Sequence, residues 1–203
     1  ISGYAFGLVD ANCARALGAP GPAPFASSPN VLVDAWQILS DGKAPDMDRV
    51  GVLSTAEYAA AAKLAQFQKL NEAPAGTDFA TASLGMLSNF RVGYDQAIGT
   101  HTAGTGTGYA VNNGPGYAIG ATQIAVDTGS GTILAGDVVH FGGVTANKYV
   151  VKSFAGSVIT LHTGLVAAIA NDAAVTIAAS HRANLLVQRD AVRLGVRPPA
   201  AAP

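Results

Sequence analysis

The chain has 203 residues, a formal net charge of −1 and 12% charged residues, well below the ~25% that is usual for soluble domains. This length suffices for one large domain or two small ones, so folding needs neither a metal nor a disulfide. Lys and Arg are scattered without a basic excess, which argues against a dedicated nucleic-acid-binding surface. A weakly charged surface suits a protein that packs against copies of itself, and it suits an ordinary extracellular β-protein equally well.

Reactive side chains are scarce. Cys13 is the only cysteine, which excludes an internal disulfide and a cysteine-rich zinc site, and core packing is its default role. The histidines stand in separate segments without i, i+4 spacing, so the sequence predicts solvated or core histidines, no metal site and no cofactor. They are His101, His140, His162 and His181.

No segment is long and apolar enough to predict a membrane span. The most apolar window, residues 164–179, is interrupted by Asn171 and Asp172 and is shorter than the ~20 apolar residues of a spanning helix. We therefore expect no membrane partner. The chain begins at Ile1 rather than Met and lacks the basic segment of a signal peptide, so we expect a processed product or a fragment.

The first two predicted elements are helices. Residues 8–17 predict a short helix, with Asp10 as its N-cap and Gly18 just past its end. A proline-rich loop follows at residues 19–24. A second helix begins at Pro29, and its apolar side chains recur at i, i+3, i+4 and i+7. They are Leu32, Ala35, Trp36 and Leu39.

Trp36 has two alternative roles. An exposed tryptophan could form a platform on which a ligand stacks, whereas a tryptophan on an apolar helical face normally belongs to the core. Because Trp36 falls on the apolar stripe of this helix, we predict that its side chain is buried.

A short strand leads directly into the third helix. Residues 50–53 predict a buried strand, and the helix extends from Thr55 to about Leu70. Ser54 and Glu57 match a capping box, in which Ser54 caps the first turn and Glu57 reaches back to the backbone N–H of Ser54.

The second half of the chain predicts β-structure. Residues 84–94 alternate as a strand or hairpin, and a Gly/Thr/Asn-rich connection at residues 101–116 suits a domain boundary. Residues 121–179 predict short strands separated by turns, and residues 184–196 predict a single returning strand or strand pair. The short strands are expected at residues 122–126, 138–141, 149–154, 158–162 and 175–179.

One motif within this β-stretch could support catalysis. Asp127, Thr128 and Gly129 match the signature of aspartic proteases, in which neighbouring hydroxyls hold a carboxylate and two carboxylates share a proton to activate water. The chain contains no second copy of the motif, so such an enzyme would have to be a homodimer of the retroviral type. The simpler interpretation is that residues 127–131 form a hairpin turn with positive φ at glycine.

The order of these segments resembles the major capsid (coat) proteins of tailed bacteriophages that carry an inserted β-barrel domain on the Hong Kong-type capsid fold. The resemblance covers roughly residues 31–199. The segments that carry it are 49–58 (RVGVLSTAEY), 85–94 (GMLSNFRVGY), 101–105 (HTAGT), 126–132 (VDTGSGT), 135–138 (AGDV) and 184–191 (NLLVQRDA), leading to Arg197-Pro198.

The resemblance implies an α+β fold and a structural role. It implies a discontinuous capsid-type core at residues 1–118 and 182–203, with the N-terminal part incomplete, and an inserted small antiparallel β-barrel at residues 119–181. The barrel would act as a folding and stabilising module. The family's N-terminal arm, extended loop and long spine helix are absent or reduced to residues 1–18, so the chain would be a fragment or a shortened relative.

The functional prediction that follows is a subunit of a phage or prophage icosahedral capsid, not an enzyme. Its expected partners are copies of itself, scaffolding and portal proteins, and packaged DNA bound without specificity. Its expected location is the virion, after assembly in the bacterial cytoplasm. Two alternatives stay open: the homodimeric aspartic protease that uses Asp127, and a tail or cell-surface β-module that binds glycans.

Overall fold

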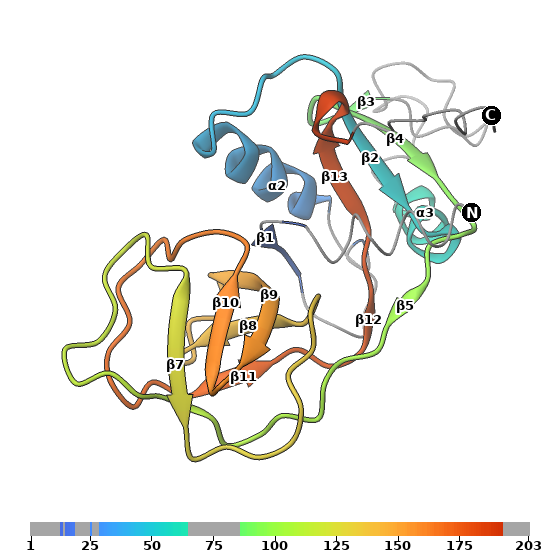
Figure 1. Ribbon diagram of the computed structural model, residues 1–203. Coiled ribbons are helices and arrows are strands. Elements are labelled where there is room, and N and C mark those ends of the chain that lie inside the picture. Colours follow the sequence, from blue (N-terminus) through green and yellow to red (C-terminus); the bar gives the residue numbers. More distant parts are fainter. Residues whose placement is uncertain (1–12, 14, 19–24, 26–28, 65–85, 193–203) are drawn as a thin grey trace, which may run out of the picture.

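The computed structural model describes residues 13, 15–18, 25, 29–64 and 86–192 (Figure 1). Within them the architecture is mixed, with two helices, a four-stranded sheet and a nearly closed, barrel-like sheet. A mixed architecture agrees with the predicted α+β class. The two sheets lie on opposite sides of the molecule in Figure 1, with a thin two-stranded ribbon between them.

We call the four-stranded sheet the core sheet. Its order is β13 (Leu185–Gln188), β2 (Arg49–Leu53), β4 (Phe90–Tyr94) and β3 (Met86–Leu87). The two central strands are parallel, and each edge strand is antiparallel to its neighbour. The last described strand, β13, therefore lies beside β2, and strands β6 to β11 of the barrel-like sheet lie between them along the chain.

Helices α2 (Asn30–Asp41) and α3 (Thr55–Ala62) share one hydrophobic cluster with the core sheet. Burial of each large side chain in such a cluster stabilises the fold by about 1.5–3 kcal/mol. Its buried members are Phe25, Leu32, Ala35, Leu53, Ala61, Leu64, Phe90 and Val92.

We call the other large sheet the barrel. Its strands follow the order β11 (Val175–Ile177), β8 (Val138–Phe141), β9 (Lys148–Ala155), β10 (Val158–Leu161), β7 (Gln123–Asp127) and β6 (Ala110–Val111). The first and last strands of this order meet: Val111 N donates to Ala173 O at 3.0 Å, and Val175 N donates to Tyr109 O at 2.8 Å. These two hydrogen bonds nearly close the sheet on itself.

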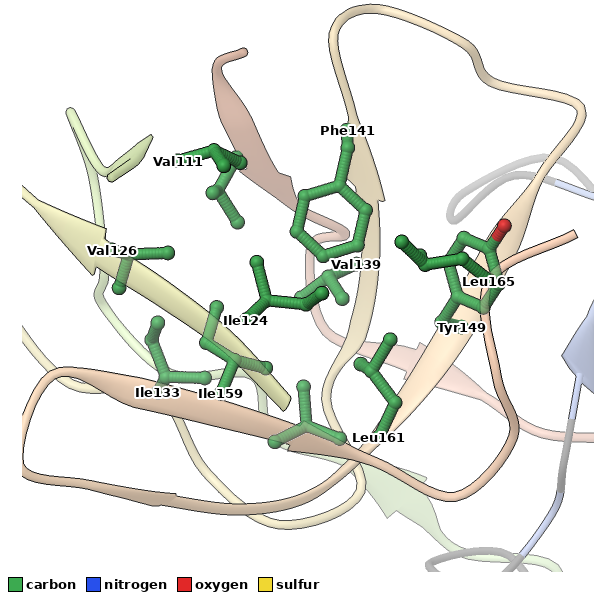
Figure 2. Close-up of a cluster of buried hydrophobic side chains, with 12 residues drawn as sticks. Val111, Ile124, Val126, Ile133, Val139, Phe141, Tyr149, Ile159, Leu161 and Leu165 are labelled. Atoms are coloured by element: carbon green, nitrogen blue, oxygen red, sulfur yellow. The ribbon is translucent and has the colours of Figure 1, made fainter. Parts of the chain in front are cut away.

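The barrel has a hydrophobic core of its own. Figure 2 shows labelled side chains from β6, β7, β8, β9 and β10 pointing toward one another inside the sheet. Along each strand the inward residues alternate with outward ones, as the side-chain period of two requires. The buried members are Val111, Ile124, Val126, Ile133, Val139, Phe141, Tyr149, Val151, Ile159, Leu161, Leu165 and Val175.

The ribbon between the two sheets consists of β5 (Thr100–His101) and β12 (His181–Arg182), which are antiparallel. The chain enters the barrel through β5 and leaves it through β12, so both crossings lie side by side (Figure 1). Strand β6 lies before residue 119 and already belongs to the barrel sheet, while the predicted domain boundaries themselves stay a prediction.

Several predicted elements are confirmed. Strand β8 has the predicted bounds, and β7, β9, β10 and β11 begin and end within two residues of their predicted positions. Strand β6 was not predicted, because its residues fall in the Gly/Thr/Asn-rich connection at residues 101–116. The hairpin predicted at residues 84–94 corresponds to β3 and β4, and the helix predicted from Pro29 corresponds to α2. The predicted end of the third helix near Leu70 lies outside the described residues.

Three predictions in the N-terminal half are wrong. Residues 15 and 16, expected at the end of a helix, form strand β1 (Arg15–Ala16), which pairs with β9 of the barrel. Trp36 is 39% exposed, because Leu32 and Ala35 suffice to fill the contact of α2 with its neighbours. The N–H of Ser54 donates to Asn184 Oδ1 at 2.8 Å rather than to Glu57.

The other half of the predicted capping box is present. The hydroxyl of Ser54 accepts a hydrogen bond from the N–H of Glu57, at 3.5 Å. Asn184 immediately precedes β13, so its bond to Ser54 ties the returning strand to the start of α3. The contact spans 130 residues of sequence, which local patterns do not encode.

Candidate functional site

Asp127, the residue of the protease hypothesis, is the last residue of β7 and is exposed. Thr128 follows with a φ of 58°, and its hydroxyl donates to the carbonyl oxygens of Gly108 at 3.0 Å and of Asp127 at 2.8 Å. Among the described residues, no hydroxyl is hydrogen bonded to the Asp127 carboxylate. The protease hypothesis, which requires such hydroxyls and a second carboxylate, stays a prediction.

Residues 127–131 do not form the predicted hairpin turn. Strand β7 pairs with β10 and β6 rather than with β8, the strand that follows it. The segment instead passes beside the Gly/Thr-rich loop, where Ser130 and Thr107 exchange two backbone hydrogen bonds. Positive φ occurs at Thr128 and Gly131, and not at Gly129.

Gly129 is required for a steric reason. A Cβ atom at this position would lie 2.2 Å from Cγ of Tyr109, so the Tyr109 ring covers the glycine directly. That ring also packs edge-on against Phe154, with 5.6 Å between centroids, and its hydroxyl donates to Gly131 O at 3.1 Å. The glycine of the Asp-Thr-Gly sequence therefore has a packing role in the barrel wall.

The carboxylate of Asp137 is a buried polar group with several hydrogen-bond partners. It is fully buried in the turn before β8. Oδ1 accepts from Gly104 N at 3.1 Å and lies 2.9 Å from His101 Nε2, while Oδ2 accepts from Leu134 N at 2.7 Å. With Nε2 protonated, His101 donates to this carboxylate, and protonation of both ring nitrogens would make the contact an ion pair.

This carboxylate holds three separate segments together. His101 belongs to the ribbon, Gly104 to the loop that enters the barrel, and Leu134 to the turn before β8. Gly104 fits closely, because a Cβ atom there would lie 2.3 Å from Thr132 O. We call Asp137, His101, Gly104 and Leu134 the junction site, since they connect the ribbon to the barrel.

The histidines are only partly brought together. His101 and His181 face each other across the ribbon, with 5.6 Å between ring centroids, and His181 Nδ1 lies 2.8 Å from Ala179 O. His140 and His162 lie elsewhere in the barrel. The described residues contain no group of three or more His, Cys, Asp or Glu side chains that could hold a metal ion.

His140 lies in an unusual environment on the outer side of β8. Its neighbours in sequence, Val139 and Phe141, point into the barrel core, so the imidazole lies on the opposite side of the sheet. Nδ1 is buried and has no hydrogen-bond partner within the part of the chain that the structure describes. Burial lowers the pKa of His140, and the positive charge of Lys148 lowers it further. Burial also lowers the pKa of Lys148.

A groove of about 440 Å3 lies on the barrel surface where β6 meets β11. Residues 106–110 line one side, and Asp172 with residues 174–177 lines the other. The sequence pointed to the Gly/Thr-rich loop only as a flexible connection. Only the hydrogen-bond pattern of the folded barrel, which local sequence does not encode, shows that this loop forms one side of a groove.

Sequence reasoning also missed the junction site. Asp137 stood out in the sequence only as part of the segment 135–138, and His101 only as a solvated or core histidine. The sequence did contain one signal: an aspartate that follows a glycine and directly precedes an apolar strand. A carboxylate at such a position can accept hydrogen bonds from the N–H groups of its own turn. The contact with His101 spans 36 residues and could not be predicted.

Comparisons with known proteins give no match. No protein family model matches the chain, and no curated protein matches it. In the part of the chain that the structure describes, neither helix has the length and apolar character needed to cross a bilayer.

Proposed function

We propose that the chain is a structural subunit of a phage or prophage icosahedral capsid, in which an inserted β-barrel interrupts a capsid-type core. The observation that carries the proposal is the path of the chain. It builds β2 and β4 of the core sheet, enters the barrel through β5, leaves through β12, and returns as β13 beside β2.

The packing supports an insertion. The hydrophobic cluster of the barrel and that of the core sheet share no residue, so each body has its own source of stability. The two connections are adjacent, because His101 pairs with His181 across the ribbon. A module joined at two adjacent points can be inserted into a fold without separating the strands on either side of it.

The surface supports self-association. Only 12% of the residues are charged, and large apolar side chains are exposed on both bodies. They include Val33 of α2, Met86 of β3, and Ile119 and Val166 on the barrel. Exposed apolar side chains and few charges are compatible with extensive contacts between copies. The proposed partners are copies of the chain, scaffolding and portal proteins, and packaged DNA without sequence preference.

The test is the state of the full chain in solution. We expect concentration-dependent association into large particles in sedimentation velocity, and shells in electron micrographs of the same fractions. A chain that stays monomeric at every concentration would contradict the proposal. Peptidase activity that pepstatin inhibits and that Asp127→Asn abolishes would favour the aspartic-protease alternative instead.

A further inference from the structure

The barrel does not close along its full height. The hydrogen bonds between its first and last strands end at Val175, whose N–H donates to Tyr109 O at 2.8 Å. Beyond this point β11 continues to Ile177. The segment on the other side of the groove runs from Gly108 back to Gly106. The groove of about 440 Å3 lies between these two segments.

The backbone of Ile177 faces this groove. Gly142 N donates to Ala174 O at 2.9 Å and Ala178 N donates to Val138 O at 2.8 Å, so even-numbered residues of β11 direct their N–H and C=O groups toward β8. By the alternation of an antiparallel ladder, Val175 and Ile177 direct theirs the other way. Val175 N finds Tyr109 O, whereas Ile177 has no backbone partner on this side among the described residues.

The opposite side of the groove cannot supply that partner. Thr107 directs its N–H and C=O groups to Ser130, at 2.9 and 3.0 Å, and Gly106 N donates to Thr132 O at 2.8 Å. These groups therefore bond to residues 130–132, which follow β7, and not to β11. Gly106 and Gly108 contribute no side chains to this side of the groove, and the side chain of Ile177 lies against Gly106.

We propose that this groove binds one extended segment of a second copy of the chain, which adds to the free edge of β11 at Ile177. The inference rests on the proposed capsid function and names a site of contact between copies. An unpaired donor and acceptor on a strand edge are matched by the backbone of an extended peptide, and strand addition of this kind is a common mode of recognition.

The charge of the groove selects among the proposed partners. Asp172 is the one charged side chain among the lining residues, so the phosphates of DNA would meet a negative charge and no cation. An uncharged segment from a chain with 12% charged residues meets no such repulsion. A copy of the chain therefore fits the groove better than nucleic acid does.

The test places a charge beside the free edge. Thr176 is exposed, and its neighbour Val175 points into the barrel core, so the side chain of Thr176 lies on the outer face of β11. In Thr176→Lys, the lysine blocks strand addition, as charged residues do on natural edge strands. The matched control is Thr160→Lys, because Thr160 also faces outward but pairs with Gln123 on one side and Ser153 on the other.

The readout is self-association of the full chain by sedimentation velocity, with hydrogen exchange at Ile177. We expect Thr176→Lys to weaken association by about tenfold or more and Thr160→Lys by less than about twofold, with urea midpoints similar to wild type in both. Exchange of the Ile177 N–H should slow when wild-type chains associate.

The outcomes separate this inference from the proposed function. If Thr176→Lys associates like wild type, or if exchange at Ile177 is unchanged by association, the groove is not the contact, while the capsid proposal stands. If exchange at Ile177 slows only when a different protein is added, a copy of the chain is not the occupant. If the wild-type chain does not associate at all, both proposals fail.

Discussion

His101 Nε2 lies 2.9 Å from Asp137 Oδ1, and this contact fastens the ribbon to the barrel at the point where the chain passes from one to the other. The side chain of Asp137 is fully buried and that of His101 is 15% exposed. A buried carboxylate is stable only when it is hydrogen bonded, so each donor around Asp137 contributes to the stability of the barrel.

We predict that two substitutions in the junction site lower the free energy of unfolding by unequal amounts. Asp137→Ala leaves the N–H groups of Gly104 and Leu134 without their acceptor, so we expect the free energy of unfolding to fall by about 3–5 kcal/mol. His101→Ala leaves the carboxylate with both N–H donors, and we expect a loss of about 1–3 kcal/mol. Urea unfolding followed by near-ultraviolet circular dichroism measures both. Equal losses in the two variants would show that the backbone contacts do not matter.

Gly129 provides a prediction about the Asp-Thr-Gly motif. In Gly129→Ala the new methyl group meets the Tyr109 ring and must displace it from Phe154, so we expect a loss of about 1–3 kcal/mol of stability. Gly114→Ala is the control, because a Cβ atom at Gly114 meets nothing within 4 Å. Thermal unfolding of the two variants measures the difference, and an unchanged midpoint for Gly129→Ala would rule out the packing role.

Most barrel strands could be predicted from the sequence because the pattern that defines each strand is local. Residues 158–161, for example, alternate between inward Ile159 and Leu161 and outward neighbours, and turn residues stand on both sides. The errors arose where contacts between residues far apart in the sequence determine the burial or the role of a side chain. Trp36 is exposed because the sheet beneath α2 needs only part of its apolar stripe, and the role of Asp137 depends on a histidine 36 residues away.

His140 predicts a pH dependence of stability. Its pKa in the folded chain is lower than the 6.5 of a free histidine, because burial and Lys148 disfavour the charged imidazole. The unfolded chain therefore binds more protons than the folded one as the pH falls below 6.5, and the folded chain loses stability there. Well above pH 6.5 both states are neutral at this residue, and its contribution is constant.

The variant that tests this pH dependence is His140→Gln, which keeps a polar side chain but cannot titrate. We expect the loss of stability of the wild type as the pH falls through and below 6.5 to be smaller in His140→Gln, and the two stabilities to differ by a constant amount well above pH 6.5. Urea unfolding at a series of pH values measures the difference. Parallel curves across the whole range would show that His140 is not the group responsible.

Arg49 provides the last prediction, on the core sheet. Its guanidinium is fully buried and donates to the carbonyl oxygens of Ala44 at 2.9 Å, Pro45 at 3.1 Å and Trp36 at 3.3 Å. The same group lies 2.9 Å from a carboxylate oxygen of Asp46, whose side chain is 64% exposed. The planar fork thus fastens the end of α2, and the loop after it, to the start of β2.

A lysine at this position cannot reproduce the fork. We expect Arg49→Lys to lower the free energy of unfolding by about 2–4 kcal/mol, because at least two of the buried carbonyls lose their donor. Asp46→Asn is the control, and because the Asp46 side chain is exposed we expect a change below about 1 kcal/mol. Urea unfolding measures both variants. A loss in Asp46→Asn as large as that in Arg49→Lys would mean that the ion pair, rather than the carbonyl contacts, holds α2 in place.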